Sequence, residues 1–256
     1  MTLLESFLLG IVEGATEFLP VSSTGHLILA STLLGIAQSD FVKTFEIAIQ
    51  LGAILAVVAL YWRSFLNIEL LKKLIVAFLP AGLIGFAVYP FLKASLLGNN
   101  VVVLASLFVG GVILILFERW YGAREDAAPP DAPLSYRQAL LVGFFQAVAI
   151  IPGISRSGAT IIGGMLLGLA RPAIVEFSFL LAVPTMLAAT GYDLLTAGTA
   201  FAEQEWLVLA VGFATSCIIA MAAIRWLLGY VRNHSFTGFG VYRILLSIAF
   251  ATFLFL

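Results

Sequence analysis

The sequence predicts an all-α integral membrane protein with six transmembrane helices and two re-entrant helical hairpins. Of its 256 residues, 62% are hydrophobic and only 11% are charged, whereas a soluble domain has about 25% charged residues. Six apolar runs have about the 20 residues that a helix needs to cross a bilayer. Two further apolar stretches, 2–36 and 137–170, are interrupted near their middles, so neither half of either stretch is long enough to cross alone. The net charge of −1 provides no basic surface for nucleic acid.

These elements follow one another in two similar halves of a single membrane domain, 1–256. The first repeat, 1–120, contains hairpin 2–36 and spans 44–62, 73–93 and 101–119. The second repeat, 137–256, contains hairpin 137–170 and spans 175–195, 206–228 and 239–256. Residues 121–136 contain several Pro, Ala and Asp residues, a composition typical of a loop, and we expect them to link the repeats.

The two interrupted stretches resemble each other in sequence. "FLPVSSTGHLIL" corresponds to "IIPGISRSGATII", with Pro20 and Pro152, and likewise Ser23 and Ser155, 132 residues apart. Each repeat has three spans, an odd number, so the second must insert upside down. Inverted-topology repeats with broken helices are typical of transporters, whose sites lie near the midplane where the broken elements meet.

Basic residues predict the orientation, because cytoplasmic loops carry an excess of Lys and Arg. The loops after the first, third and fifth spans hold or flank Arg63, Lys72, Lys73, Arg119, Arg124, Arg137, Arg171, Arg225 and Arg232. The opposite side has Lys43 and Lys93. We therefore expect the first side, with the linker 121–136, to be cytoplasmic. Glu118 is expected at the cytoplasmic flank of its span, and Glu176 is expected to pair with Arg171 at the interface.

The first interruption contains "EGATEFLPVSSTGH", residues 13–26. Glu13 and Glu17, four residues apart, share one helix face. Ionised carboxylates at membrane depth are costly and indicate function. The two can share a proton, which raises one pKa, or bind a divalent cation through oxygen. The alternative is that this helix lies at the membrane surface with both carboxylates in water.

A helix start follows Pro20, which ends the first half-helix. Ser22, Ser23 or Thr24 can cap the next helix, and the free N–H groups of a helix start form an anion site. His26 lies in its first turn and can act as acid, base or nucleophile. A lone histidine on an apolar helix is usually structural, but here carboxylates and hydroxyls surround it.

The second interruption, "PGISRSGAT" (152–160), contains Arg156. Arginine at membrane depth is costly, and its planar fork suits phosphate oxygens. Further hydroxyls come from Ser155, Ser157 and Thr160. The alternative role for Arg156 is a structural salt bridge to Glu13 or Glu17, which can also alternate with phosphate binding.

If the two hairpin tips meet, these groups can hold a phosphate and attack it. Serine or histidine would be the nucleophile and glutamate the base, while arginine would stabilise charge on the phosphoryl oxygens. Gln50, on the first span, can reach the same site.

At these residues the chain resembles the undecaprenyl-diphosphate phosphatases of bacterial membranes, also called bacitracin-resistance proteins. The motifs are "EGATEFLPVSSTGHL" (13–27), "FEIAIQLGAILAV" (45–57) and "PGISRSGAT". The resemblance implies hydrolysis of a C55 polyprenyl diphosphate to the monophosphate and phosphate, recycling the lipid carrier for peptidoglycan synthesis. It also implies a site open to the outer face of the cytoplasmic membrane, and bacitracin resistance when more enzyme is made, because bacitracin sequesters this substrate.

The resemblance further implies roles for individual residues. Glu13 and Glu17 form its glutamate motif, which is associated with Mg²⁺ or Ca²⁺. Ser23 is the favoured nucleophile, with His26 as its partner or rival. Phosphate ligands are Ser22, Thr24, Ser155, Arg156 and Ser157.

A transporter or flippase for a lipid phosphate is the alternative, since inverted repeats are found in transporters. A transporter needs Arg156 and an anion-binding helix start, but has less use for Ser23, His26 and two glutamates together. A purely structural membrane protein would not need the arginine. Gly- and Ala-rich faces at 105–111 and 209–223 can pack helices closely, within the chain or in a homodimer.

Overall fold

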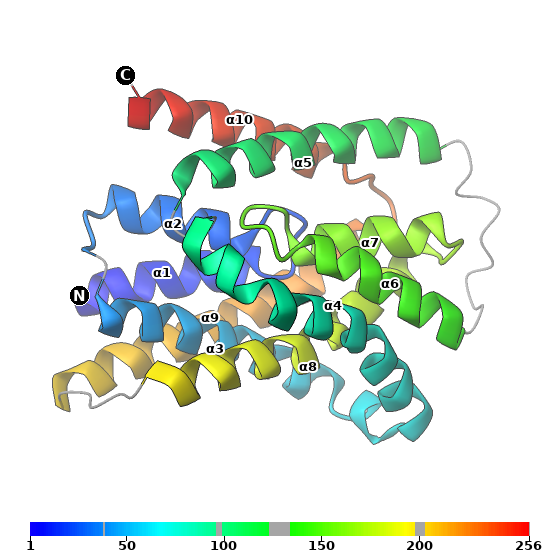
Figure 1. The fold of residues 1–256 in the computed structure, drawn as a ribbon, viewed down its shortest axis with the longest axis horizontal. Helices are drawn as coiled ribbons and strands as arrows, with labels where there is room; N and C mark the ends of the chain where they lie inside the picture. The colour runs from blue at the N-terminus through cyan, green and yellow to red at the C-terminus, as the bar shows by residue number, and fades with distance from the viewer. Residues whose placement is uncertain (38, 96–98, 123–133, 198–202, 256) are drawn as a thin grey trace.

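The structure is a computed structural model that describes residues 1–37, 39–95, 99–122, 134–197 and 203–255. In these ranges the regular elements are helices α1 to α10 and one short 3-10 helix, η1 (Ser64–Leu66) (Figure 1). Most of the predicted linker, residues 123–133, lies outside the described ranges, as do the side chains of Lys93 and Arg124.

Six helices are long and apolar enough to cross a membrane. They are α3 (Asp40–Tyr61), α4 (Ile68–Ser95), α5 (Asn100–Tyr121), α8 (Arg171–Ala197), α9 (Glu203–Tyr230) and α10 (Thr237–Phe255). Each coincides with one predicted span. The protein is therefore an all-helical, multi-pass membrane protein.

Each interrupted stretch forms two short helices. The first contains α1 (Leu3–Thr16) and α2 (Ser23–Leu33), and the second contains α6 (Tyr136–Val148) and α7 (Arg156–Leu166). Figure 1 shows these pairs between the α5–α10 pair on one side and α3, α8 and α9 on the other. The re-entry of both hairpins into the membrane and the inverted topology of the repeats stay predictions.

The first half-helix ends earlier than expected. It ends at Thr16 rather than running to Pro20, and Glu17 is its C-terminal cap. The reason is that the carbonyl of Thr16 would need the N–H of residue 20, which proline lacks. The same relation ends α6 at Val148, four residues before Pro152. Each helix therefore ends one turn before the proline, because the proline cannot donate the hydrogen bond that would continue it.

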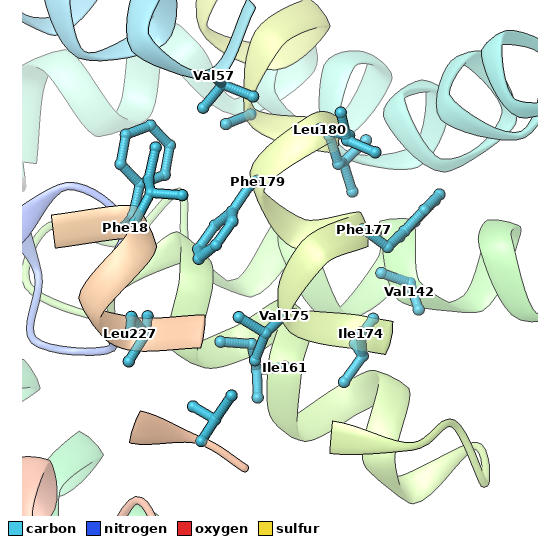
Figure 2. Close-up of a cluster of buried hydrophobic side chains, with 14 of the residues drawn as sticks. Phe18, Val57, Val142, Ile161, Ile174, Val175, Phe177, Phe179, Leu180 and Leu227 are labelled. Atoms are coloured by element: carbon cyan, nitrogen blue, oxygen red, sulfur yellow. The ribbon is translucent and has the colours of Figure 1, made fainter. Parts of the chain in front are cut away.

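The core packs directly beneath the first break. Phe18, which follows Glu17, is fully buried, and its ring meets Phe179 of α8 edge to face at a centroid distance of 5.4 Å. Figure 2 shows these two rings among aliphatic side chains, including Val175 and Ile161. Such an aromatic pair contributes about 0.5–1.5 kcal/mol beyond its buried area. The core thus fixes the backbone next to Glu17 to helix α8.

The glycine-rich faces pack within the chain. A Cβ at Gly14 of α1 would lie 2.5 Å from the carbonyl oxygen of Ser216 on α9. A Cβ at Gly111 of α5 would lie 2.7 Å from the carbonyl oxygen of Gly240 on α10. Small residues therefore allow close backbone approach at α1–α9 and α5–α10. A homodimer stays a prediction.

One expectation about charged flanks is wrong, and it concerns the partner of Arg171. Glu118 lies in the last turn of α5, at the end of its span as expected, and it is buried there. Arg171 donates to both of its carboxylate oxygens, at 2.6 and 2.9 Å, rather than serving Glu176 at the interface. Glu118 also accepts from the backbone N–H of Phe236. This buried pair ties α5 and α8 to the start of α10.

Candidate active site

Two helix starts, one from each hairpin, form the base of the site. Ser22 caps α2 and Ser155 caps α7, each accepting from the N–H of the glycine three residues later. Both serines have positive φ, 70° at Ser22 and 39° at Ser155, where non-glycine residues are uncommon. Ser22 is thus the structural equivalent of Ser155. The sequence alignment, which pairs Ser155 with Ser23, is therefore wrong by one residue at this position. Strained backbone of this kind is concentrated at functional sites.

Glu17, Ser23 and Arg156 form one connected group. The Ser23 hydroxyl donates a short hydrogen bond to Glu17 Oε2. Arg156 Nη2 donates to the other carboxylate oxygen, Glu17 Oε1, at 2.8 Å. The structure therefore brings the two hairpins together through a carboxylate, a hydroxyl and a guanidinium. The salt bridge weighed as an alternative role for Arg156 is present.

Arg156 is held on its other side by helix α8 and by the core. Its Nη1 donates to the carbonyl of Ser178 at 2.8 Å, and its Cζ lies 5.8 Å from the ring centroid of Phe18. Its Nε is buried and has no hydrogen-bond partner in the part of the chain that the structure describes. Since Arg has five N–H donors, the guanidinium retains capacity for an acceptor not present in the structure.

A cavity of about 290 Å³ opens over this group. Its polar lining comes from Glu17, Ser22, Ser23, Thr24, Gln50, Ser155, Arg156 and Thr185. Its apolar lining includes Ile150, Ile151, Met186 and Ala189. Seven predicted site residues therefore face one cavity, as expected if the hairpin tips meet.

His26 is buried outside the cavity lining. Its Nδ1 donates to the Ser22 carbonyl at 2.8 Å, and its Nε2 lies 2.7 Å from the Tyr242 hydroxyl. Burial lowers the pKa of His26 below its usual value; a neutral ring that donates at Nδ1 to the carbonyl accepts from Tyr242 at Nε2. His26 therefore stabilises the turn at Ser22 from the side away from the cavity.

Ser157 and Thr160 also lie behind the cavity. Ser157 Oγ donates to the carbonyl of Leu19 at 2.8 Å, which joins the second hairpin to the first. Thr160 Oγ1 lies 2.6 Å from Ser178 Oγ and also bonds its own helix. These two hydroxyls support the site in this structure rather than facing the cavity as the phosphate ligands that the sequence suggests.

Glu13 is fully buried one helical turn before Glu17. Burial first, and the charge of Glu17 next, raise the pKa of Glu13 well above its usual value. Both of its carboxyl oxygens lack a hydrogen-bond partner among the described residues. Unsatisfied buried oxygens of this kind suit a proton or a cation. Beside Glu17 they are compatible with Mg²⁺, which binds through one or two carboxylates and completes its shell with water and phosphate.

Sequence reasoning missed Tyr242 and Arg243 on α10. Arg243 is almost completely buried and donates to carbonyls of both breaks, at Pro20 and Gly153. A signal was present, because an arginine inside an apolar span is costly and indicates function.

Fold and site define a multi-pass membrane protein with a polar cavity between two helical hairpins, suited to a phosphate group. The family model of the bacitracin resistance protein BacA matches residues 6–249. The chain belongs to this family.

Relatives match the chain over nearly its whole length. The undecaprenyl-diphosphatase of Aquifex aeolicus is 52% identical over 254 residues, 99% of each chain. That of Sulfurihydrogenibium sp. is 50% identical over 250 residues, 98% of each chain. That of Thermus thermophilus is 47% identical over 253 residues, 97% of this chain and 96% of the relative.

Proposed function

We propose that this protein is a membrane phosphatase that hydrolyses undecaprenyl diphosphate to undecaprenyl phosphate and inorganic phosphate. The single observation that carries the proposal is the group of Glu17, Ser23 and Arg156 at one cavity. A hydroxyl bonded to a carboxylate beside a guanidinium is the arrangement that phosphoryl transfer to a serine requires. The names of the relatives supply the substrate.

The reaction follows from the positions of these groups. Ser23 Oγ attacks the terminal phosphorus, and Glu17 accepts the proton of the hydroxyl. The bond from this phosphorus to the bridging oxygen breaks, and the polyprenyl monophosphate leaves. Arg156 exchanges its bond with Glu17 for phosphoryl oxygens as charge develops on them. Water then hydrolyses the phosphoserine, releasing inorganic phosphate and restoring the Ser23 hydroxyl.

The cavity lining orients the lipid. The helix starts at Ser22 and Ser155 present N–H groups for the diphosphate. The first isoprene units lie against the apolar wall that includes Ile151 and Ala189, both exposed, and the remaining tail extends into the bilayer. This places the headgroup between the hairpins and the tail among membrane lipids.

A divalent cation, Mg²⁺ or Ca²⁺, would be held by Glu13 and Glu17 together with the diphosphate. When bound, it would neutralise charge on the phosphoryl oxygens. The support for this assignment is that both Glu13 oxygens lack a hydrogen-bond partner among the described residues and that Glu13 lies one helical turn from Glu17; Glu13 itself lies outside the cavity lining.

The names of the relatives do not favour a lipid-phosphate transporter using the same site. We place the protein in the bacterial cytoplasmic membrane with the cavity open to the outer face, on the basis of the charge bias in its loops. There, the reaction would return the carrier to peptidoglycan synthesis and oppose bacitracin.

The test is phosphate release from undecaprenyl diphosphate by the purified protein in detergent, with and without EDTA. Arg156→Lys keeps the charge but loses the planar fork. We expect it to lower kcat/KM by about 100-fold, which corresponds to roughly 2.7 kcal/mol of barrier. Arg119→Lys, at an exposed arginine, is the matched control and keeps wild-type activity. If folded wild-type protein releases no phosphate with any added metal, the proposal fails, and a flipping assay in liposomes follows.

A further inference from the structure

Arg243 is a buried cation that the proposed reaction does not use and that, unlike Arg171, has no carboxylate partner among the described residues. It lies on α10 and is 2% exposed. Its side chain forms no ion pair among the described residues; instead it donates to four backbone carbonyls. Nε donates to Leu107 at 3.2 Å, Nη1 to Pro20 at 3.3 Å, and Nη2 to Ser106 at 3.0 Å and Gly153 at 2.9 Å. A buried charge is costly unless its hydrogen bonds are satisfied, so this placement needs a reason.

Two of the four carbonyls belong to the two breaks. Pro20 lies two residues before the capping serine Ser22, and Gly153 lies two residues before Ser155. A single planar group therefore fixes both turns that present the cavity's helix starts. The other two carbonyls are on α5, so the guanidinium is also anchored to a helix outside the hairpins.

Two glycines allow the close packing around this group: Gly110 leaves room for the guanidinium, and Gly153 lets the second turn approach α5. A Cβ at Gly110 of α5 would overlap the guanidinium. Gly153 has a φ of 93°, and a Cβ there would lie 2.7 Å from the carbonyl oxygen of Val103. Beside Arg243, Tyr242 contacts His26, which in turn bonds the Ser22 carbonyl. Helix α10 thus supports the first break at two successive residues.

We propose that Arg243 is a positioning residue that holds the two hairpin turns in register, so that Glu17 and Ser23 of one meet Arg156 of the other. It acts through backbone carbonyls and touches neither the substrate nor the reacting atoms. The kinetic part of this inference rests on the proposed function, whereas its structural part does not.

The structural part is tested by hydrogen–deuterium exchange of the full-length protein in nanodiscs. In Arg243→Gln we expect faster amide exchange at both turns, in peptides covering residues 17–25 and 149–158, with peptides of α8 and α9 unchanged. Gly110→Ala provides a second variant, because it keeps the arginine but displaces its guanidinium. Gly122→Ala, at the C-terminal cap of the same helix with open space around it, is the matched control and should exchange as wild type.

The kinetic part uses phosphate release by the same proteins. Misplacing reacting groups by about 1 Å can cost about 100-fold, so Arg243→Gln and Gly110→Ala should lower kcat strongly with KM changed only a few-fold. Arg243→Lys keeps the charge but cannot reach both turns at once, and should recover less than a tenth of wild-type kcat.

Each outcome decides the proposal. Faster exchange confined to both turns supports it, even if no phosphatase activity is found in any protein. Unchanged exchange at the turns in both Arg243→Gln and Gly110→Ala overturns it, as does faster exchange spread evenly over the chain. Full activity of Arg243→Lys would show that a positive charge at residue 243 is sufficient. It would overturn the inference that the planar guanidinium must bond both turns at once.

Discussion

Ser23 donates its hydroxyl hydrogen to the carboxylate of Glu17, six residues earlier and across the first break. The two residues lie on opposite sides of Pro20, one at the end of α1 and the other at the start of α2. The break thus brings the proposed nucleophile and its proposed base together within one local segment. The second hairpin adds the cation.

Glu17→Gln tests the carboxylate as a base. The amide keeps the size of the side chain but accepts no proton from Ser23, and general-base catalysis is typically worth about 100- to 10,000-fold. We expect kcat to fall by that range while the protein remains folded, measured by phosphate release and thermal unfolding. Glu5→Gln, on the same helix but partly exposed in its first turn, is the control. Activity within tenfold of wild type in Glu17→Gln would contradict the assignment.

Ser23→Ala separates the serine from His26 as the nucleophile. Rapid quenching of wild type with substrate labelled in the terminal phosphate should trap label on the protein, and the label should survive acid, as a serine phosphate does. Ser23→Ala should trap none. His26→Asn should still trap label, because the ring lies outside the cavity lining. An acid-labile label that disappears in His26→Asn would assign the nucleophile to the histidine.

Ser22 allows a prediction about stability. Ser22→Ala removes a helix cap, a loss that typically costs about 1 kcal/mol, and leaves a side chain at a φ of 70°. Ser22→Gly relieves that φ, and glycine at a cap costs only a few tenths of a kcal/mol relative to serine. We therefore expect thermal unfolding in detergent to rank glycine at or near wild type and alanine below both. The reverse order of alanine and glycine would argue against strain at this residue.

Ala189 tests the placement of the lipid tail. Ala189→Phe adds a ring to the apolar wall of the cavity and should obstruct the first isoprene units while leaving Glu17 and Arg156 in place. KM for a long polyprenyl diphosphate should rise several-fold. Hydrolysis of inorganic diphosphate, which has no tail, should be unchanged if wild type shows it at all. An unchanged KM for the long substrate would indicate that the tail does not lie against Ala189.

Much of the architecture is predictable because it depends on local properties. Long apolar runs predict all six spans, and prolines in otherwise apolar stretches predict both breaks. The resemblance of the two breaks predicts that the hairpins meet, and Glu17, Ser23 and Arg156 do meet. Because Pro20 has no N–H to bond the carbonyl of Thr16, the end of α1 at Thr16 could also have been predicted from the sequence.

Other features depend on packing between distant segments. The pairing of Arg171 with Glu118 joins residues 53 apart, and sequence proximity points instead to Glu176. The reach of Arg243 to both breaks depends on the close approach of α5 and α10 at Gly111 and Gly240. No local pattern indicates which way these side chains point. The same holds for Ser157 and Thr160, whose motif suggests ligands although their hydroxyls bond backbone and Ser178.

The contact between Arg156 and Glu17 spans 139 residues of chain. During synthesis, Glu17 and Ser23 are therefore translated long before the arginine whose guanidinium balances the carboxylate. A nascent chain that stops after α5 carries Glu17 without its counter-charge and lacks Arg156 of the proposed catalytic group. If the proposed reaction is right, activity would begin only when the second hairpin packs against the first, and no partly synthesised chain would hydrolyse substrate. Two separately expressed halves, divided in the segment 123–133, should be inert alone and active only when they assemble.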